Sequence, residues 1–560
     1  MLNFSKDPTE ALREMEGVLF YLAAFGFIDG QFDKSERDFI DEFVLDLAAT
    51  REPDDKSVAG RARRSALVDQ LDRKLDRIIA ELRAMWDEPT AEGERAPSFV
   101  RSRMKLRCFE IMEGFRREDR KVLIQAVDQL LDADGVAHPE EVQFRAELVA
   151  MLDAKRADLG PPPTLQHAAT RLNRVVLHDQ VERPRAEANH PALTPLERHF
   201  SSDPEELRRQ LNADIRRMKE VTRILETKRQ GHRGKLAGKQ TVQELHGLGS
   251  FLDEHVHVVA PTHPAGYELT VLGDLHGCYS NLKAALMQSD FMRKVERFTK
   301  NPAANPEPLL VLLGDYIDRG LYSFEGVLRG VLGLYLAAPR HVIVLRGNHE
   351  YFHEKDGKVF GGVRPAEAID NLKPYAPMEV FHAYKALFET LPNVMLFDDL
   401  MFVHGGIPRD SSLRERYTDL SSLNDPILRF QMMWSDPSSA DLVPEELQES
   451  TNRFAFGREQ ARSFMHRIGV RTLIRGHEKV DQGYVEVYDE PHLRLLTLFS
   501  AGGADNWDLP ERSSYRSVIP TALTIRYRDG RTDIEPWVID YASYNDPERN
   551  EFFNVDADEA

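Results

Sequence analysis

Five short apolar runs, each followed at once by a small polar motif, constrain the fold of this chain more than any other feature. The runs are rich in Val, Ile and Leu, which is typical of strands buried in a sheet. In chain order they are 269–272 before GDLHG, 309–313 before GDYIDRG, 342–345 before RGNHE, 400–403 before HGG and 472–474 before RGHE. Ligands bind in the loops beyond the carboxyl ends of such strands. We therefore expect the polar residues of all five motifs to meet at one edge.

The motifs carry six side chains that can hold metal ions. They are Asp274, His276, Asp315, Asn348, His404 and His477. All six offer oxygen or imidazole nitrogen and none offers a thiolate, which suits divalent ions; manganese is our first choice, with iron, zinc or magnesium as alternatives. Six ligands are too many for one open catalytic ion, so we expect two ions that share the central Asp315. Two ions roughly 3.5–4 Å apart would clamp a phosphoryl group and generate a hydroxide nucleophile near neutral pH.

In these ordered motifs the chain resembles the PPP-type serine/threonine protein phosphatases of the calcineurin-like metallophosphoesterase superfamily. The resemblance covers about half of the chain, roughly 267–541, and includes FETLP at 388–392, WSDP at 434–437 and LTLFSA at 496–501. A single GD or HGG element would be ordinary turn chemistry, whereas five in order are specific. The resemblance implies a four-layer α/β domain, a β-sandwich flanked by helices. It also implies hydrolysis of phosphoserine or phosphothreonine by direct attack of a metal-bridging hydroxide.

The resemblance further assigns the metal ligands. It implies that the first ion is held by Asp274, His276 and Asp315. It implies that the second ion is held by Asp315, Asn348, His404 and His477.

The resemblance also assigns residues that act on the substrate. His349 would protonate the leaving alkoxide, and Asp318 would orient its ring and raise its pKa. Arg319 would grip the phosphoryl oxygens, with Arg453 as the candidate for a second such arginine, because guanidinium groups bind phosphate in bidentate fashion. Arg346 and Asp436 are further candidates at the substrate edge.

Two features depart from the family pattern and leave the substrate open. The segment around Arg453 is shorter than the usual arginine loop. After 500–501 comes GGADN, without the tyrosine that lines the substrate site of eukaryotic members. Two alternatives to a protein phosphatase therefore remain: a hydrolase of nucleotides such as dinucleoside polyphosphates on the same fold, and a catalytically inactive binding scaffold.

Composition narrows the partners and the location. Asp and Glu outnumber Lys and Arg by 92 to 73, for a formal net charge of −19, so neither nucleic acid nor an anionic membrane is expected as a general partner. No segment reaches the roughly 18 apolar residues of a membrane span, and the two cysteines, Cys108 and Cys278, fit a reducing interior. We expect a cytoplasmic protein whose phosphoprotein or small phosphoester substrate is attracted by the metals and arginines.

Residues 1–157 show apolar residues at helical spacing throughout, which predicts an all-α domain. A DG-x5-E element occurs twice in it, at 29–36 and 134–141. This element resembles the tellurite-resistance TerB-like helical domain. The acids could bind calcium or another metal, but the loops lack the ligand spacing of an EF-hand and a turn accounts for them. We expect a sensing or docking domain that takes a regulatory partner.

Proline and charge set the remaining boundaries. Prolines over 158–200 and a basic helical stretch over 204–245 predict a linker and arm at 158–247, a catalytic domain at 248–545 and an acidic tail at 546–560. We interpret the basic side of the arm as a solvated helix face rather than a regulatory surface.

Helices are expected over 360–391, where substrate selectivity would be set. The Asp-Gly pair at 529–530 predicts a hairpin between 521–527 and 533–539.

Overall fold

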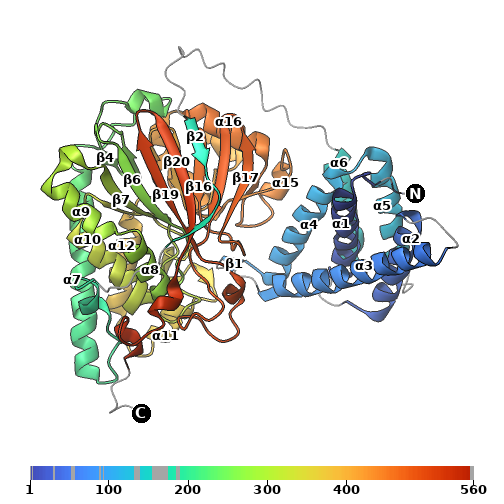
Figure 1. The fold of residues 1–560 in the computed structure, drawn as a ribbon, viewed down its shortest axis with the longest axis horizontal. Helices are drawn as coiled ribbons and strands as arrows, with labels where there is room; N and C mark the ends of the chain where they lie inside the picture. The colour runs from blue at the N-terminus through green and yellow to red at the C-terminus, as the bar shows by residue number, and fades with distance from the viewer. Residues whose placement is uncertain are drawn as a thin grey trace. The chain divides into compact units, whose positions relative to one another are not determined.

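The structure, a computed structural model, describes residues 2, 4–28, 32–51, 57–87, 90–91, 94–131, 139–153, 174–183 and 190–554 (Figure 1). The contacts within the chain define two compact units. One comprises Met1–Asp158 with Ser438–Thr451, and the other Leu159–Pro437 with Asn452–Ala560. The predicted domain boundaries at 157, 247 and 545 stay predictions.

The first unit is helical in its described part, as expected. Its helices are α1 (Pro8–Gly26), α2 (Lys34–Arg51), α3 (Val58–Ala84), α4 (Ala96–Gly114), α5 (Arg117–Leu131), α6 (Pro139–Asp153) and the short α15 (Glu445–Gln448), with a two-residue strand β1 (Thr90–Ala91). Asp7 caps α1 by accepting hydrogen bonds from the amides of Thr9 and Glu10. Helix α1 is buried along most of its length and packs against α3, α4 and α5. The Asp-Gly pairs at 29–30 and 134–135 lie outside the described residues.

The second unit contains two seven-stranded sheets. The first has the order β2-β20-β19-β6-β7-β8, with β3 also paired to β20. Its strands are β2 (Arg174–Leu177), β3 (Val181–Glu182), β6 (Tyr267–Leu272), β7 (Glu307–Leu312), β8 (Val342–Val344), β19 (Thr521–Arg528) and β20 (Arg531–Val538). The second has the order β17-β18-β16-β13-β12-β5-β4. Its strands are β4 (Phe251–Asp253), β5 (Val256–Val259), β12 (Val394–Phe397), β13 (Leu400–Val403), β16 (Thr472–Arg475), β17 (Tyr484–Glu490) and β18 (Leu493–Leu498).

All five predicted strands are observed, but they are divided between the two sheets. Strands β6, β7 and β8 are parallel neighbours in the first sheet, and β13 and β16 are parallel neighbours in the second. The hairpin predicted around 529–530 is also confirmed, since β19 and β20 pair antiparallel on either side of Asp529 and Gly530. Both turn residues have positive φ, 51° and 76°, as a tight hairpin turn requires.

Successive residues of each strand point to different layers. In β7, Leu309 and Val311 join a core cluster that also contains Phe402 and Leu496 of the second sheet, so the two sheets face each other. Leu310 points the other way, into a cluster with helices. Because one face of each sheet is covered by the other sheet and one by helices, both faces are buried.

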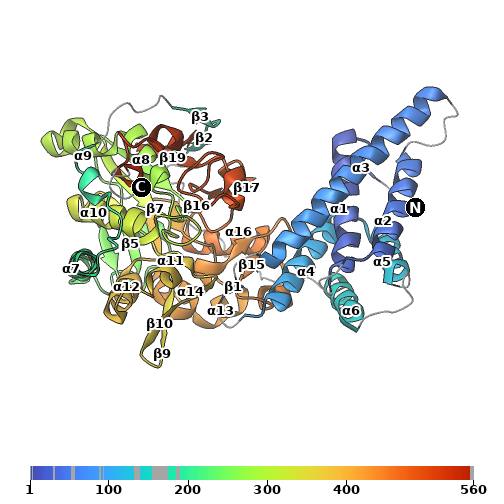
Figure 2. The same ribbon diagram turned by 90° about the horizontal axis from the view of Figure 1, so that it is seen from below.

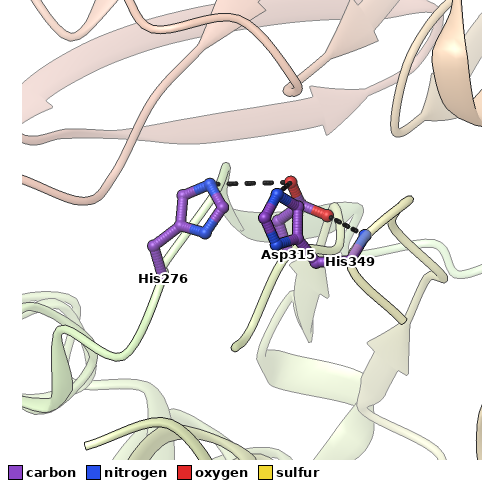
Figure 3. Close-up of side chains that lie close together, drawn as sticks. All are labelled: His276, Asp315 and His349. Atoms are coloured by element: carbon purple, nitrogen blue, oxygen red, sulfur yellow. Dashed lines mark hydrogen bonds and ion pairs between the residues drawn. The ribbon is translucent and has the colours of Figure 1, made fainter. Parts of the chain in front are cut away.

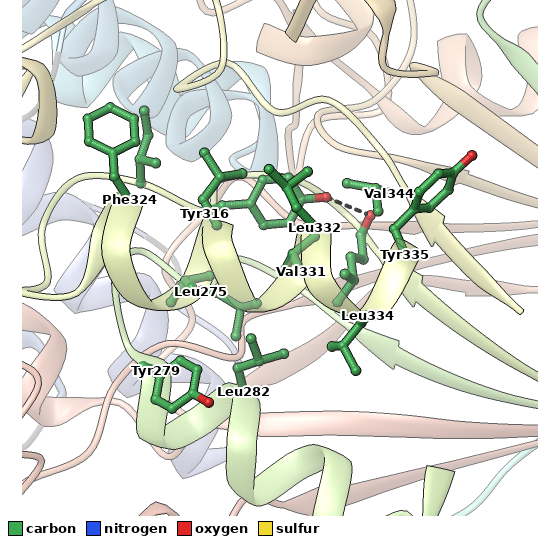
Figure 4. Packing of buried hydrophobic residues seen from close by; sticks show 14 of the residues in the cluster. Leu275, Tyr279, Leu282, Tyr316, Phe324, Val331, Leu332, Leu334, Tyr335 and Val344 are labelled. Carbon is green, nitrogen blue, oxygen red and sulfur yellow. Dashed lines mark hydrogen bonds between the residues drawn. The ribbon is translucent and has the colours of Figure 1, made fainter. Parts of the chain in front are cut away.

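The outer layers are helical. The helices of the second unit are α7 (Pro204–Arg229), α8 (Tyr279–Gln288), α9 (Phe291–Lys300), α10 (Arg329–Ala337), α11 (Glu367–Leu372), α12 (Met378–Thr390), α13 (Asp410–Arg416), α14 (Pro426–Trp434) and α16 (Arg458–Ile468), with a π-helix η5 (Ser323–Leu328) before α10. Figure 4 shows Val331 and Leu332 of α10 packed near Leu275 and Tyr316, in the loops after β6 and β7. On the second sheet the covering residues include Met432 of α14 and Phe464 of α16.

Helix α7, in the stretch expected to hold a basic helical arm, packs into the core of the second unit. Leu211, Met218 and Leu225 are buried in the cluster that α7 shares with α10 and α12. Its opposite side carries exposed basic residues such as Arg216 and Arg223, in agreement with the solvated-face interpretation. An amphipathic helix is placed by its apolar stripe, whatever the charge of its outer side.

The stretch after the third motif is only partly helical, so the expectation of helices over 360–391 is wrong at its start. Strands β9 (Phe352–Lys355) and β10 (Lys358–Gly361) form an antiparallel hairpin that projects from the unit (Figure 2), and β11 (Val363–Arg364) follows. Asp356 and Gly357 form its turn with positive φ. This Asp-Gly pair was the sequence signal for the hairpin.

Within the described ranges, no helix combines the length and apolarity that crossing a membrane requires.

Candidate metal centre

The loops after the five strands converge, although the strands belong to two sheets. Within the first sheet, the amides of Leu275 and His276 both donate to the carbonyl of Asp315, at 3.0 and 2.9 Å. Hydrogen bonds also join loops of the first sheet to loops of the second. His404 Nδ1 lies 3.1 Å from the Leu313 carbonyl, and the amide of His477 donates to Asp274 Oδ1 at 2.9 Å. The packing of the sheets therefore brings the motifs together.

A first group of atoms that could hold a metal ion surrounds one oxygen of Asp315. His276 Nε2 lies 3.6 Å from both Asp315 Oδ2 and Asp274 Oδ2, and His349 Nε2 lies 3.8 Å from Asp315 Oδ2. Figure 3 shows one oxygen of the Asp315 carboxylate linked to a ring nitrogen of each histidine. His276 Nδ1 is 3.0 Å from the Ile317 carbonyl, and donation to that carbonyl leaves the Nε2 lone pair facing the carboxylates.

A second group surrounds the other oxygen of Asp315. His404 Nε2 lies 3.3 Å from Asp315 Oδ1. The side-chain oxygen of Asn348 lies 2.8 Å from His404 Nε2 and 3.0 Å from His477 Nδ1. Asp315 thus belongs to both groups. Its role as a bridging ligand, and the roles of the other five donors, stay predictions.

The residues present fit a pair of divalent ions. Asp274 Oδ2 and His477 Nε2 are buried without a hydrogen-bond partner among the described residues. Burial raises the pKa of Asp274 to about 7 and that of Asp315 to about 8, and it lowers the pKa of His276 and His477 well below the usual range. Divalent cations would favour the ionised carboxylates and the neutral imidazoles, which offsets the cost of burying them.

Backbone strain is concentrated in the same loops. His276, Asp315, Asp318, Arg319 and His477 all have positive φ, between 41° and 72°. Such conformations cost a non-glycine residue roughly 1–3 kcal/mol and persist where surrounding contacts enforce them. These backbone conformations direct the polar side chains of the loops toward the group of donors around Asp315.

Two glycines of the motifs permit the close approach. A Cβ on Gly347 would lie 2.2 Å from Asp315 Oδ1, and a Cβ on Gly476 would lie 2.3 Å from Asp274 Oδ1. Both positions therefore exclude a side chain. This explains why the polar residues of these two motifs follow glycine.

His349 and Asp318 form a buried pair beside the first group. His349 Nδ1 lies 2.7 Å from Asp318 Oδ2, and the amide of Ala368 donates to Asp318 Oδ1 at 2.7 Å. Burial raises the pKa of Asp318 to about 6. Burial, and after it the charge of Arg319, lower the pKa of His349 well below the usual range. The expected contribution of Asp318 to that pKa stays a prediction. The hydrogen bond fixes the ring.

Two of the predicted phosphate-binding arginines flank the centre. Arg319 Nη1 donates to both carboxylate oxygens of Glu367 at 2.6 Å, whereas its Nη2 is buried without a hydrogen-bond partner among the described residues. Arg453 Nη1 lies 3.4 Å from Asp436 Oδ2. Both arginines lower the pKa of His349, so both charges are close to the centre.

Arg346 is placed differently. Its Nε donates to the Glu350 carbonyl at 3.2 Å, and its guanidinium lies 5.3 Å from the centre of the Tyr351 ring. It is 6% exposed and stabilises its own loop. The described contacts of Arg346 include none of the six donors.

Sequence reasoning missed the roles of Glu350 and Tyr515. The buried Glu350 carboxylate accepts hydrogen bonds from the amides of Asp315, Tyr316 and Gly347, at 2.8, 2.9 and 3.0 Å. The sequence signal for this role was the position of Glu350 in the RGNHE motif. The three amides that converge on its carboxyl group need a hydrogen-bond acceptor. The Tyr515 ring lies 5.3 Å from the His276 ring and 5.2 Å from the Phe499 ring. It comes from a later turn than the missing family tyrosine, and no sequence signal indicated it.

Comparison with known proteins finds similarity in this part of the chain. Residues 267–481 match the calcineurin-like phosphoesterase family. The chain is 27% identical over 239 residues to a "Probable serine/threonine-protein phosphatase" of Encephalitozoon cuniculi (strain GB-M1). The match covers 42% of this chain and 47% of that relative, so the chain spans about half of the relative's length.

Two solved structures show lower similarity. A protein serine/threonine phosphatase from Saccharomyces cerevisiae with similarity to human phosphatase PP5 is 20% identical, with a TM-score of 0.39, and the match covers 58% of this chain and 89% of that one. Purple acid phosphatase PPD1 from yellow lupin (Lupinus luteus) is 11% identical, with a TM-score of 0.22, and the match covers 52% and 57%. The TerB-like resemblance of the helical region stays a prediction.

Proposed function

We propose that this chain is a metal-dependent phosphomonoester hydrolase acting on phosphoserine or phosphothreonine in proteins. The match of residues 267–481 to the calcineurin-like phosphoesterase family supports the proposal. One observation carries the proposal. Asp315 and five further nitrogen and oxygen donors, from five loops in all, gather in one place, and the His349–Asp318 pair lies beside them. That set is suited to metal-assisted hydrolysis with a positioned acid.

The donors divide between two ions as the resemblance implies. One ion would be held by Asp274, His276 and Asp315. The other would be held by Asp315, Asn348, His404 and His477. Two divalent ions, when bound, neutralise phosphoryl oxygens and lower the pKa of a water molecule toward neutrality.

The remaining residues would act on the phosphoryl group and the leaving oxygen. An approaching phosphoryl dianion favours the imidazolium form of His349 and so opposes the effects of burial and of Arg319. Asp318 holds the ring by its 2.7 Å contact with Nδ1, which leaves Nε2 to give its proton to the serine or threonine alkoxide. Arg319 Nη2, which has no hydrogen-bond partner among the described residues, would bind a phosphoryl oxygen together with Arg453.

Phosphate release from two panels tests the proposal. One contains phosphoserine and phosphothreonine peptides, and the other contains nucleotides with dinucleoside polyphosphates among them. The full chain is treated with a chelator and then resupplied with Mn²⁺. We expect chelation to abolish activity, Mn²⁺ to restore it, and peptides to be cleaved with at least about tenfold higher kcat/KM than nucleotides.

The two alternatives give different results. Preference for nucleotides would establish the nucleotide hydrolase instead. If metal-replenished protein cleaves no phosphoester while binding metal and phosphopeptide, the chain is a scaffold.

A further inference from the structure

A large cavity lies beside Arg319 in the second unit. Its volume is about 1140 Å³. Its walls come from the start of α7 and the residues before it (200–211), from 319–325, and from α11 with the following turn (367–377). Residues 200–211 lie outside the 267–481 stretch that matches the phosphoesterase family. The cavity is therefore built partly from a segment outside that match.

The lining is mainly apolar. Leu207, Phe324 and Leu372 are among the lining residues. Two further lining residues, Leu321 and Tyr375, are 56% and 72% exposed. Large hydrophobic side chains exposed around a concave apolar surface are typical of a ligand-binding site.

Helix α11 connects this cavity to the metal centre. Glu367 and Ala368 both line the cavity. Glu367 holds Arg319 through both carboxylate oxygens at 2.6 Å, and the amide of Ala368 donates to Asp318 Oδ1 at 2.7 Å. Arg319 itself forms part of the wall. A substrate whose phosphoryl group reaches Arg319 therefore has its neighbouring atoms at the mouth of the cavity.

We propose that the cavity binds apolar residues of the substrate protein next to its phosphoserine or phosphothreonine. This inference rests on the proposed function and narrows its substrate class. Pockets for small ligands are typically about 300–1000 Å³, so the cavity has room for an extended peptide segment. Arg208 lines it, is exposed, and has neither an ion pair nor a hydrogen bond among the described residues. It favours an acidic side chain in the part of the peptide that reaches α7.

Phosphothreonine peptides that differ only in their flanking residues test the inference. One series has Leu and Phe on either side of phosphothreonine, and the matched series has Ser. 4-Nitrophenyl phosphate, which has no flanking chain, is the third substrate, and all reactions use the full chain with Mn²⁺. For the unmodified protein we expect kcat/KM to be at least about tenfold higher with the apolar series than with the Ser series.

The variants Leu321→Asp and Tyr375→Ala change exposed residues in two different segments of the cavity wall. Each should lower the preference for the apolar series by about tenfold, equivalent to about 1.4 kcal/mol of transition-state binding. Leu248→Asp is the matched control, because Leu248 is 45% exposed and is not among the cavity's lining residues. It should keep the preference of the unmodified protein.

Three results would overturn the inference. The first is equal cleavage of both peptide series by the unmodified protein. The second is retention of the apolar preference in both variants, and the third is cleavage of 4-nitrophenyl phosphate but of no peptide. In all three, the assignment as a hydrolase survives. Failure to cleave any of the three substrates would instead refute the proposed function, and this inference with it.

Discussion

The two units of the chain differ in what they bury. In the helical unit, the described core consists mainly of hydrophobic side chains such as Val18, Leu22 and Phe25, and charges such as Lys105 and Glu147 pair near the surface. The second unit buries a cluster of carboxylates and imidazoles. Burying such groups is costly unless partners or cations compensate them. The second unit therefore gives up stability to gather these groups in one place.

The largest effect is expected from Asp315→Asn. Asp315 belongs to both groups of ligating atoms, so the substitution should lower bound metal and reduce kcat/KM on phosphopeptides roughly a thousandfold, equivalent to about 4 kcal/mol. Phosphate release and elemental analysis measure both effects. Asp119→Asn, at a carboxylate in the helical unit that is 3% exposed, is the matched control and should stay within about twofold of the unmodified protein. Equal losses of bound metal and kcat/KM in both variants would show that a buried carboxylate of the helical unit matters as much for activity as Asp315.

The converse substitution, Phe25→Ala, should affect stability alone. Phe25 is 0% exposed, and its ring makes edge contacts with Tyr21 and Phe144 at 5.2 and 5.0 Å. Its removal should cost the helical unit about 3–5 kcal/mol of unfolding free energy. In urea unfolding followed by circular dichroism and by phosphate release, the loss of helix should move to lower urea while activity persists. Phe25→Leu should cost less, and a parallel loss of activity would show that the units unfold together.

Asp318→Asn separates orientation of the acid from binding of metal. The variant loses the carboxylate that fixes the ring of His349, so kcat on phosphoserine peptides should fall about a hundredfold. The loss on 4-nitrophenyl phosphate should be much smaller, because its leaving group needs no proton. Asp290→Asn is the matched control, since Asp290 has the same left-handed backbone, with φ of 54° against 70°. Equal losses of Asp318→Asn on both substrates would contradict the acid role of His349.

The smallest effect concerns a half-exposed pair in the second unit that should behave like the surface pairs of the helical unit. His246 Nε2 lies 2.8 Å from Asp398 Oδ1, and this hydrogen bond raises the pKa of His246 above its usual 6.5. The stabilisation is fully present below pH 6.5 and is lost as the pH rises through the raised value. His246→Gln should thus cost less than about 1 kcal/mol at pH 5.5 and nothing at pH 9. Urea unfolding at both pH values measures this cost in unfolding free energy. An equal cost at pH 5.5 and pH 9 would show that a charged His246–Asp398 pair does not stabilise the protein.

Regular elements were predictable from the sequence because their signals are local. Periodicity predicted the helices of the first unit, the runs of Val, Ile and Leu predicted the five strands, and an Asp-Gly pair predicted the hairpin between β19 and β20. The same Asp-Gly signal occurs at Asp356 and Gly357, where β9 and β10 form a hairpin in place of the start of the helices predicted over 360–391. The packing of α7 could not be predicted in the same way, since its partners α10 and α12 are distant in the sequence.

The sequence by itself determined the set of polar groups that the site can use, because donor chemistry belongs to each residue type and the motifs fix their order. Only the tertiary structure decided how they meet. The strands before the motifs lie in two sheets, and the face-to-face packing of those sheets closes the centre. It also decided that Tyr515 lies beside His276, that Glu367 holds Arg319, and that a cavity opens next to that arginine. These are contacts between residues far apart in the chain, and their geometry depends on how whole layers pack.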